Sequence, residues 1–308
     1  MASSITSVEV RVPGSTSNLG AGFDCFGLAL QIYLKVKASV EPDLDGETVI
    51  ELADGNENAP LAASRDNLVY RAMKYAAERG DFRLPAVRLE IDTHVPVSRG
   101  LGGSAAAIIA GIKLFDLLFD RALSDATVLR YATELEGHAD NAAPSLFGGF
   151  AVNCIDDQGN VISLKKSWPQ DIAVVVVVPE IHLETKLARE ALPLEVSHRD
   201  AVFNLQRAAL FTAALDEGRY ELLWEAMQDR LHQRKRGLLV PGLGEALVTP
   251  RMPGLLGVAL SGAGPSVVAL ARDNLDEIGR TIAANFEAQG ISSRVLELQV
   301  DDAGCRNF

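Results

Sequence analysis

Gly100, Gly102 and Gly103 stand just before a run of small apolar residues, in the stretch VPVSRGLGGSAAAIIAG of residues 95–111. A glycine-rich turn between a strand and a helix binds anions, because the first N–H groups of the helix are unpaired and its dipole is positive at that end. Glycine lacks a Cβ, so the main chain can approach a phosphate closely. Ser104 can offer its hydroxyl to a phosphate oxygen or to Mg²⁺. A plain turn with a serine N-cap explains the same letters equally well.

Two standard phosphate loops do not account for this stretch. The Walker pattern requires Gly-Lys-Ser/Thr, and no such tripeptide occurs in the chain. The dinucleotide fingerprint matches by letter at Gly100, Gly102 and Ala105, but that fold places an acidic residue at the end of a following strand. Asp116 and Asp120 instead fall inside or at the end of a helical run. Neither of these two classes of nucleotide site is therefore favoured.

A helix must follow the glycine-rich turn, and the hydrophobic periodicity places it over residues 104–119, which are apolar nearly all round as in a buried helix. Residues 171–179 form a continuous β-branched run, which is typical of a strand covered on both faces. Further strands are expected over residues 8–12, 28–40, 87–91 and 294–300, from residue 150 onward, and on both sides of a glycine-rich turn within 255–271. Further helices are expected over residues 67–79, 124–137, 199–217, 220–231 and 274–289, with a short one ending at residue 146.

The connections and the composition predict a globular protein of two domains. Residues 13–22 are expected to form a turn-rich loop and residues 41–65 a polar connection. The chain has 308 residues, 48% of them apolar and 23% charged, which is enough for a full core. Because the pattern changes near residues 163–170, the domains are expected to cover residues 1–165 and 166–308.

Charge and cysteine usage exclude several classes of partner. The formal net charge is −12 and the 29 Lys and Arg residues are scattered, which argues against a nucleic-acid partner. The three cysteines lie far apart with no CxxC pair, so neither a disulfide framework nor a zinc site is indicated. No basic N-terminal segment precedes an apolar one, and no stretch approaches about 18 apolar residues. We therefore expect a cytoplasmic protein with no membrane partner.

The stretch PVSRGLGGSAAA resembles the central motif of the GHMP kinase superfamily, usually Pro-x3-Gly-Leu-Gly-Ser-Ser-Ala, with Gly103 standing where serine is commoner. PGSTSNLGAGFDCFGLAL (13–30) resembles the N-terminal motif in its homoserine kinase form, and SGAGPS (261–266) the C-terminal glycine motif. EGHADNAAPSLFGG (136–149), TKLAREALP (185–193) and DRLHQRKRGLLVPG (229–242) also match. Six motifs in family order make the chain similar to the homoserine kinase family.

This resemblance implies an α+β protein with the GHMP kinase fold. Its N-terminal, ATP-binding domain is expected to resemble domain 2 of ribosomal protein S5, and its C-terminal domain to be ferredoxin-like, with the active site between them. The implied enzyme is an ATP:L-homoserine O-phosphotransferase, which phosphorylates the side-chain hydroxyl of L-homoserine in threonine biosynthesis. The implied ligands are ATP, Mg²⁺ and L-homoserine, and the implied assembly is a homodimer.

The resemblance also implies the nucleotide and metal contacts. Ser104 and Glu136 are expected to hold Mg²⁺, which prefers hard oxygen ligands; without the resemblance, Glu136 is better explained as a solvated carboxylate. Asn67 and Leu68 are expected near adenine, although an N-capped helix explains both equally well. The remaining nucleotide-binding residues are expected to be Pro96, Val97, Ser98, Arg99, Gly100, Leu101, Gly102, Gly103, Ser104, Ala105, Ala106, Ser261, Gly262 and Gly264.

L-Homoserine is a zwitterion with a hydroxyl at its far end. Its pocket therefore requires an anion for the ammonium, a cation for the carboxylate and polar groups for the hydroxyl. Within the matched motifs, Asp24 meets the first demand. Arg189 and Arg236 meet the second, because a guanidinium binds a carboxylate with two parallel hydrogen bonds. Taken singly, an arginine in such a stretch is usually a solvated surface charge.

Asn18, His138 and Asn141 are expected to line the hydroxyl end of the substrate. In the related mevalonate kinases an aspartate just before an asparagine takes the hydroxyl proton, and Asp140-Asn141 has that dipeptide. The resemblance therefore makes Asp140 and Asn141 the candidate catalytic residues. A loose, largely dissociative transition state does not require a strong base, so the identity of the base is left open.

Overall fold

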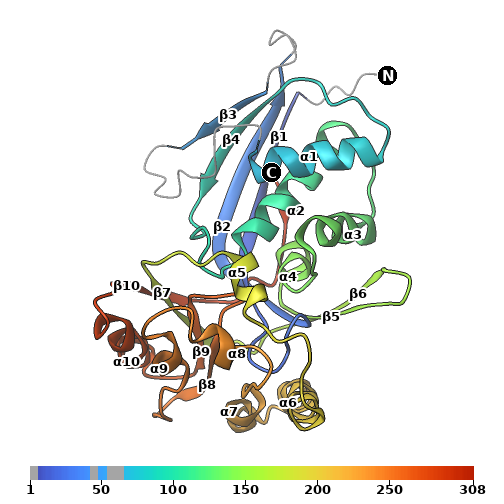
Figure 1. Ribbon diagram of the computed structural model, residues 1–308. Coiled ribbons are helices and arrows are strands. Elements are labelled where there is room, and N and C mark those ends of the chain that lie inside the picture. The colour runs from blue at the N-terminus through green and yellow to red at the C-terminus, as the bar shows by residue number, and fades with distance from the viewer. Residues whose placement is uncertain (1–5, 42–47, 54–65) are drawn as a thin grey trace.

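The computed structural model describes residues 6–41, 48–53 and 66–308, and its strands form a seven-stranded and a four-stranded sheet (Figure 1). The larger sheet has the order β11-β1-β2-β4-β3, with β5 paired to β2 and β6 to β5. All of its pairs are antiparallel except β3 with β4. Its strands are β1 (Ser7–Ser17), β2 (Phe26–Val40), β3 (Val49–Leu52), β4 (Val87–Thr93), β5 (Phe150–Ile155), β6 (Val161–Lys166) and β11 (Arg306–Asn307).

Four helices cover the larger sheet. They are α1 (Leu68–Arg79), α2 (Gly103–Leu118), α3 (Asp125–Glu136) and α4 (Ala142–Phe147). Helices α2, α3 and α4 contact the strands of this sheet, and α1 packs on α2 and α3. Helix α2 lies at the centre of this group and contacts α1, α3, α4, β1 and β2, and 12 of its 16 residues are buried. This confirms the buried helix that its all-round apolar sequence predicts. The packing holds the N-terminus of α2 in a fixed position at the junction of the two sheets.

The smaller sheet has the antiparallel order β10-β7-β9-β8. Its strands are β7 (Ala173–Pro179), β8 (Leu255–Leu260), β9 (Val267–Ala271) and β10 (Ser293–Leu298). Along β7, Val175 and Val177 belong to the core under α10 (Leu275–Glu287) and α9 (Leu243–Leu247), while Val174, Val176 and Val178 belong to a second core on the other face. β7 is thus covered on both faces, as its continuous β-branched run predicts.

The second core, on the face of β7 opposite α10, joins the two sheets. It contains residues of the first sheet and of α6 (His198–Asp216), η1 (Tyr220–Leu222) and α7 (Leu223–Ala226). The rings of Phe26, Phe150 and Phe211 meet there with centroid separations of 5.2 to 5.4 Å. Each such aromatic pair contributes about 0.5–1.5 kcal/mol beyond its buried area. Two short helices, α5 (Thr185–Glu190) and α8 (Gln233–Arg236), complete the structure near the sheet junction (Figure 1).

Two predicted boundaries are wrong. Residues 14–17 are not part of a loop but extend β1, because they pair with β2 after a register shift between Pro13 and Gly14. The predicted helix over 220–231 ends at Ala226. The Asp229 carboxylate accepts the N–H groups of Leu231, His232 and Gln233, which replaces helical hydrogen bonds by local ones.

Six short elements were not predicted, namely β3, β6, β11, α5, α8 and α9. All have six residues or fewer, too few to show a clear period. β3 lies within the connection predicted over 41–65; the segments 42–47 and 54–65 of that connection lie outside the described residues. None of the helices in the described ranges has the length and apolar character needed to cross a membrane.

The C-terminal segment returns to the larger sheet. The N–H of Gln31 donates to the carbonyl of Gln299 at 2.9 Å, the N–H of Asp301 donates to Ala29, and β11 pairs with β1. Apart from β11, the strands of the larger sheet end by Lys166 and those of the smaller sheet begin at Ala173. Residues 299–308 therefore belong structurally with the first sheet, although they come last in the sequence.

Candidate active site

A cavity of about 320 Å³ lies where the glycine-rich loop before α2 meets α3, α4, α5, α8 and the β8–β9 turn. Side chains from both halves of the chain therefore face one space. The residues that line it are Ser17, Leu34, Leu68, Thr93, Val95, Pro96, Val97, Ser98, Arg99, Gly100, Leu101, Gly102, Gly103, Ser104, Glu136, His138, Asp140, Asn141, Glu184, Thr185, Arg189, Arg236, Gly262 and Ala263.

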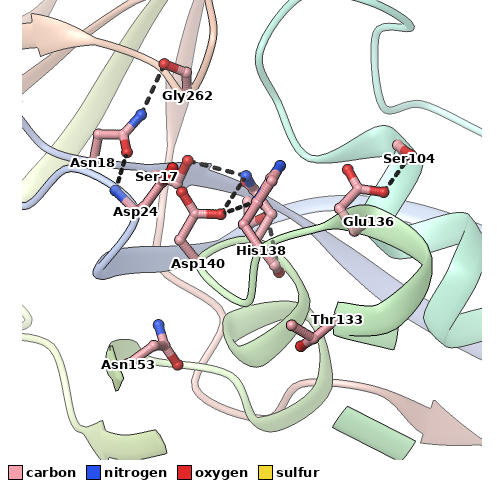
Figure 2. A network of polar contacts seen from close by, with 12 residues as sticks. Ser17, Asn18, Asp24, Ser104, Thr133, Glu136, His138, Asp140, Asn153 and Gly262 are labelled. Atoms are coloured by element: carbon pink, nitrogen blue, oxygen red, sulfur yellow. Dashed lines mark hydrogen bonds and ion pairs between the residues drawn. The ribbon is translucent and has the colours of Figure 1, made fainter. Parts of the chain in front are cut away.

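The N-terminus of α2 opens into this cavity without a side-chain cap. Its N-cap residue is Gly102, in the left-handed conformation at φ 67°, and no side chain accepts from the first N–H groups. By contrast, Asn67 caps α1 and Ser124 caps α3. Ser104 is not the N-cap; its hydroxyl donates to Glu136 Oε2 at 2.7 Å (Figure 2). The plain turn with a serine cap is therefore not what the chain forms, and the unpaired N–H groups stay available to an anion.

The glycines of this loop allow it to touch two other motifs. A Cβ at Gly100 would overlap the carbonyl oxygen of Ser261, and a Cβ at Gly102 would overlap the hydroxyl of Ser15. Ser261 in turn donates to the carbonyl of Gly100 at 2.6 Å, and the N–H of Ser15 donates to the carbonyl of Leu101 at 3.0 Å. The loop is thus held between β1 and the β8–β9 turn, with its position set by close backbone contacts.

His138, Asp140 and Asn141 form a buried polar cluster beside the cavity. Figure 2 shows His138 and Asp140 side by side. His138 Nδ1 donates to Asp140 Oδ1 at 2.5 Å. Asn141 Nδ2 donates to the same oxygen at 3.2 Å and to Ser17 Oγ at 3.0 Å, while its own Oδ1 accepts from Ser15 Oγ at 2.9 Å. Every member has a defined partner, so the cluster has one arrangement.

The charges of this cluster oppose the effect of burial. Burial favours neutral forms, but the hydrogen bond and the opposite charges outweigh it, so the pKa of His138 is raised and the pKa of Asp140 is lowered. The pair therefore favours imidazolium and carboxylate. An ionised Asp140 accepts hydrogen bonds and is a weaker base than an ordinary aspartate.

Asn18 and Asp24 lie in the loop between β1 and β2, close to the cavity. Asn18 has a left-handed backbone at φ 71°, and its amide donates to the carbonyl of Gly262 and accepts the N–H of Asp24, both at 2.9 Å. Arg189 of α5 binds Asp24 through two parallel hydrogen bonds of 3.0 and 3.1 Å. A carboxylate and a guanidinium thus meet at the cavity, 165 residues apart in the chain.

Arg236 is buried, with an exposed fraction of 2%. Its hydrogen bonds within the described residues go to uncharged acceptors, namely the carbonyl groups of Ala188 and Gly262 and the ring of His232. Burial and the neighbouring charge of Arg189 lower the pKa of Arg236 to about 10, so it stays charged at neutral pH. A buried cation whose charge has no direct counter-ion is suited to an anionic ligand.

Comparison with known proteins identifies the family. Residues 67–149 match the GHMP kinases N terminal domain and residues 211–288 the GHMP kinases C terminal. The homoserine kinase of Deinococcus radiodurans is 42% identical over 99% of this chain and 98% of the relative. The chain belongs to the homoserine kinase family. The homoserine kinase of Halothermothrix orenii is 38% identical over 96% of this chain and 94% of the relative.

A solved homoserine kinase has the same fold. The crystal structure of homoserine kinase from Cytophaga hutchinsonii superposes with a TM-score of 0.86 and 25% identity, covering 100% of this chain and 99% of that one. The GHMP kinase fold, with its mixed α+β content and two-part organisation, is thereby confirmed. The cavity between the sheets is the candidate active site of this homoserine kinase family member.

The cavity brings together most of the residues that the sequence singled out. Those that line it are Leu68, Pro96 to Ser104, Glu136, His138, Asp140, Asn141, Arg189, Arg236 and Gly262. Those that do not are Asn18, Asp24, Asn67, Ala105, Ala106, Ser261 and Gly264. Asn67 is buried, and its side chain accepts the N–H groups of Val69 and Tyr70. It forms the N-cap of α1, the alternative that its sequence context left open.

Sequence reasoning missed several residues at the cavity. Ser17 lies directly before Asn18 in the N-terminal motif, and Thr185 begins the TKLAREALP motif, so their motifs could have indicated both. Glu184 also lines the cavity, from the residue before α5. No periodic signal marks it, because a residue at the start of a six-residue helix is placed by tertiary contacts.

The His138–Asp140 pair predicts a pH-dependent stability difference. Because the pKa of His138 is raised in the folded state, His138 stabilises the fold fully below pH 6.5, its ordinary pKa. This stabilisation is lost as the pH rises through the folded pKa. Because the pKa of Asp140 is lowered in the folded state, Asp140 stabilises the fold fully above pH 3.8, its ordinary pKa. This stabilisation is lost as the pH falls through the folded pKa. His138→Asn keeps a neutral donor, so we expect its loss of Tm relative to the parent to be largest between pH 3.8 and 6.5 and to shrink as the pH rises through the folded pKa of His138. Thermal unfolding across this range measures it, and an equal Tm loss at every pH would contradict the ion pair.

Proposed function

We propose that this chain transfers the γ-phosphoryl group of ATP to the side-chain hydroxyl of L-homoserine, giving O-phospho-L-homoserine for threonine biosynthesis. One observation carries the proposal: a single cavity joins the uncapped N-terminus of α2 to the charged groups of Arg189 and Arg236. The first feature suits a nucleotide phosphate, and the second suits the carboxylate of an amino acid. The family names of the relatives agree with this assignment.

The phosphate end of the site also suits Mg²⁺. Ser104 and Glu136 present a hydroxyl and a carboxylate oxygen 2.7 Å apart beside the cavity, and both are the hard donors that this cation prefers. Within the described residues no three His, Cys, Asp or Glu side chains gather as a metal site. We infer that Ser104 and Glu136 would hold Mg²⁺ together with phosphate and water oxygens. When bound, Mg²⁺ would offset the negative charge of the nucleotide phosphates.

The substrate end has a charge for each end of the zwitterion. Asp24 and Arg189 pair with each other in this structure, so their charges are mutually satisfied. A bound zwitterion would replace this pair, with its ammonium on Asp24 and its carboxylate on Arg189 and Arg236. Asn18 would act by holding Asp24, since its side-chain oxygen accepts the Asp24 N–H. His138 and Asn141 would then border the hydroxyl of the acceptor.

Asp140 is the candidate to receive the proton of that hydroxyl. It lines the cavity, and its carboxylate is held by His138 and Asn141. Asp140→Asn keeps the size and removes the charge, so we expect kcat to fall about 10²-fold, which is the low end for loss of a general base. Steady-state kinetics with saturating ATP measures this. A fall of less than about 10-fold would show that the proton leaves without this carboxylate, as a loose transition state allows.

An acceptor panel tests the proposed activity itself. ADP release is measured with L-homoserine, mevalonate and galactose as acceptors, and the product of the homoserine reaction is identified by mass spectrometry. We expect turnover with homoserine alone, because neither of the other two carries an ammonium group for Asp24. Activity with mevalonate or the sugar and none with homoserine would replace the proposed acceptor. Absence of ADP release with every acceptor would favour a binding protein with a kinase fold.

The domain division rests on the change in sequence pattern, the location on the cysteine usage and the N-terminal sequence, and the assembly on the family resemblance. We infer domains over residues 1–165 and 166–308, with residues 299–308 packed on the first sheet, a homodimer in solution and a cytoplasmic location. Sedimentation equilibrium of the purified chain tests the assembly.

A further inference from the structure

His232 lies behind the substrate end of the cavity, in the segment between α7 and α8, and its side chain is completely buried. Its Nε2 is 2.9 Å from the carbonyl oxygen of Gly20, and its Nδ1 is 3.4 Å from Nη1 of Arg236. The ring also stacks on Phe23 with centroids 4.9 Å apart. His232 thus contacts both the loop that carries Asp24 and the buried arginine.

These two contacts determine where the ring carries its proton. A guanidinium only donates hydrogen bonds, so Nδ1 must accept from Arg236 and be unprotonated. A carbonyl oxygen only accepts, so Nε2 must carry the proton that goes to Gly20. Both bonds exist together only in the neutral Nε2–H tautomer. A second proton, on Nδ1, would face the Arg236 cation directly.

The charged groups around the ring agree with a neutral form. Burial lowers the pKa of His232, and Arg236 lowers it further, while Asp229 and Asp24 act in the opposite direction. The Asp229 carboxylate is 3.8 Å from Nε2, but its oxygens already accept three backbone N–H groups and the amide of Asn204. Asp229 therefore fixes the backbone around His232 and does not serve as its hydrogen-bond partner.

The two groups held by His232 recognise opposite ends of the substrate under the proposed function. Besides His232, Arg236 is held by its bonds to the carbonyl groups of Ala188 and Gly262, and its guanidinium lies 5.2 Å from the ring centroid of Phe23. Gly20 lies in the same short loop as Asn18 and Asp24, and a Cβ at Gly20 would overlap the main chain of Met227. One imidazole therefore spans the distance between the cation for the carboxylate and the loop with the anion for the ammonium.

We propose that His232 is a positioning residue for the amino-acid substrate, which as the neutral Nε2–H tautomer sets the spacing between Arg236 and the loop of residues 18–24. It touches no reacting atom and acts through these two groups. The proposal rests on the assignment of this end of the cavity to a zwitterionic acceptor. It concerns binding of the acceptor and not the nucleotide, which is held by the α2 end.

Two variants separate the two hydrogen bonds. His232→Gln places an amide near the Nε2 position and keeps a donor for Gly20, whereas His232→Asn places an amide near Nδ1 and keeps an acceptor for Arg236. We expect each to raise the KM for homoserine about 10-fold, the loss of one charge-assisted or buried bond. We expect kcat and the KM for ATP to change less than about 2-fold. His232→Leu, which removes both bonds, is expected to raise the KM for homoserine about 10²-fold.

A matched control distinguishes positioning from general stability. Trp168 is buried in the core between the sheets, and its Nε1 donates to the carbonyl of Ile172 at 2.9 Å. Trp168 does not line the cavity, and Trp168→Phe removes a comparable buried hydrogen bond, so we expect a lower Tm and an unchanged KM for homoserine. If Trp168→Phe raised this KM as much as the His232 variants did, or if His232→Gln and His232→Asn left it unchanged, the positioning role would be overturned.

Side-chain ¹⁵N NMR of the parent tests the tautomer without reference to catalysis. The His232 signals are assigned by their loss in His232→Gln, because the chain has five histidines. We expect Nδ1 to give an unprotonated shift and Nε2 a protonated one, with no titration near the ordinary pKa of 6.5. A protonated Nδ1, or titration near that value, would contradict the inference. An inactive parent with the expected tautomer would instead refute the proposed acceptor, so the two failures can be told apart.

Discussion

Replacing Ser104 by alanine is expected to lower kcat about 10²-fold while leaving the fold intact. The hydroxyl lies at the start of α2, where charge on the transferred phosphoryl group would be stabilised, and loss of one such group typically costs 10² to 10³ in rate. Ser104 faces the cavity, and the bond from its side chain goes to Glu136 at 2.7 Å. Because no core contact is lost, Tm is expected to stay within about 1 °C. Steady-state kinetics across a Mg²⁺ titration, with thermal unfolding beside it, measures both.

Ser124→Ala provides the matched control, because it makes the same change at the start of the neighbouring helix α3. The Ser124 side chain accepts the N–H of Thr127 at 3.2 Å and caps that helix away from the cavity. Loss of a serine cap costs about 1 kcal/mol, which lowers Tm by about 2–4 °C. We expect kcat to be unchanged. If Ser104→Ala lowered Tm and spared kcat instead, Ser104 would be a structural cap, and its proposed role at the phosphates would be wrong.

Replacing Arg236 by methionine is expected to raise the KM for homoserine by about 10² to 10³-fold, because losing one partner of a buried charge pair costs about 2–5 kcal/mol. The effect on stability is expected to be small. Arg236 is a buried charge whose hydrogen bonds go to neutral acceptors, and burial lowers its pKa to about 10. Replacing such a group by an apolar residue of similar length removes a desolvation cost as well as its bonds. Steady-state kinetics and thermal unfolding of the same preparation measure the two effects.

Arg234→Met is the control for this variant, since Arg234 has the same chemistry two residues earlier and is exposed. We expect the KM for homoserine to stay within about 2-fold of the parent value. Equal effects of the two substitutions would show that net positive charge near the cavity matters and that the buried position does not. A Tm that falls by many degrees in Arg236→Met alone would show that Arg236 serves the fold more than the substrate.

The local elements of this protein could largely be predicted from the sequence. The apolar run of β7 predicts a strand covered on both faces, and the helices predicted over 67–79 and 124–137 begin at Asn67 and Ser124, the residues that cap α1 and α3. These features depend on residues within a few positions of each other, so a single sequence contains them. The wrong helix end at Ala226 has a local cause as well, but the Asp229 side chain that competes with the helix is indistinguishable in sequence from a solvated aspartate.

The charged site could not be predicted from local pattern. Arg236 follows two other basic residues, a context in which arginine is usually solvated, yet it is buried while Arg234 and Lys235 are exposed. Only the packing of α8 behind the β8–β9 turn separates the buried side chain of Arg236 from the exposed side chains of Arg234 and Lys235. The pairing of Asp24 with Arg189 likewise joins residues 165 positions apart. Resemblance to a family could nominate these residues, but their burial and partners depend on tertiary contacts.

The sequence by itself determined the family, the motifs and the regular elements, because these follow from residue type and short-range spacing. It left open whether the glycine-rich loop was a phosphate site or a plain turn with a serine cap. The tertiary structure excludes the serine cap: Gly102 occupies the N-cap position of α2, Ser104 turns to Glu136, and the helix N-terminus opens into a cavity. The reason is physical, since an unpaired N–H group is a binding site only where the surrounding chain leaves room for an anion, and that room is created by elements distant in sequence.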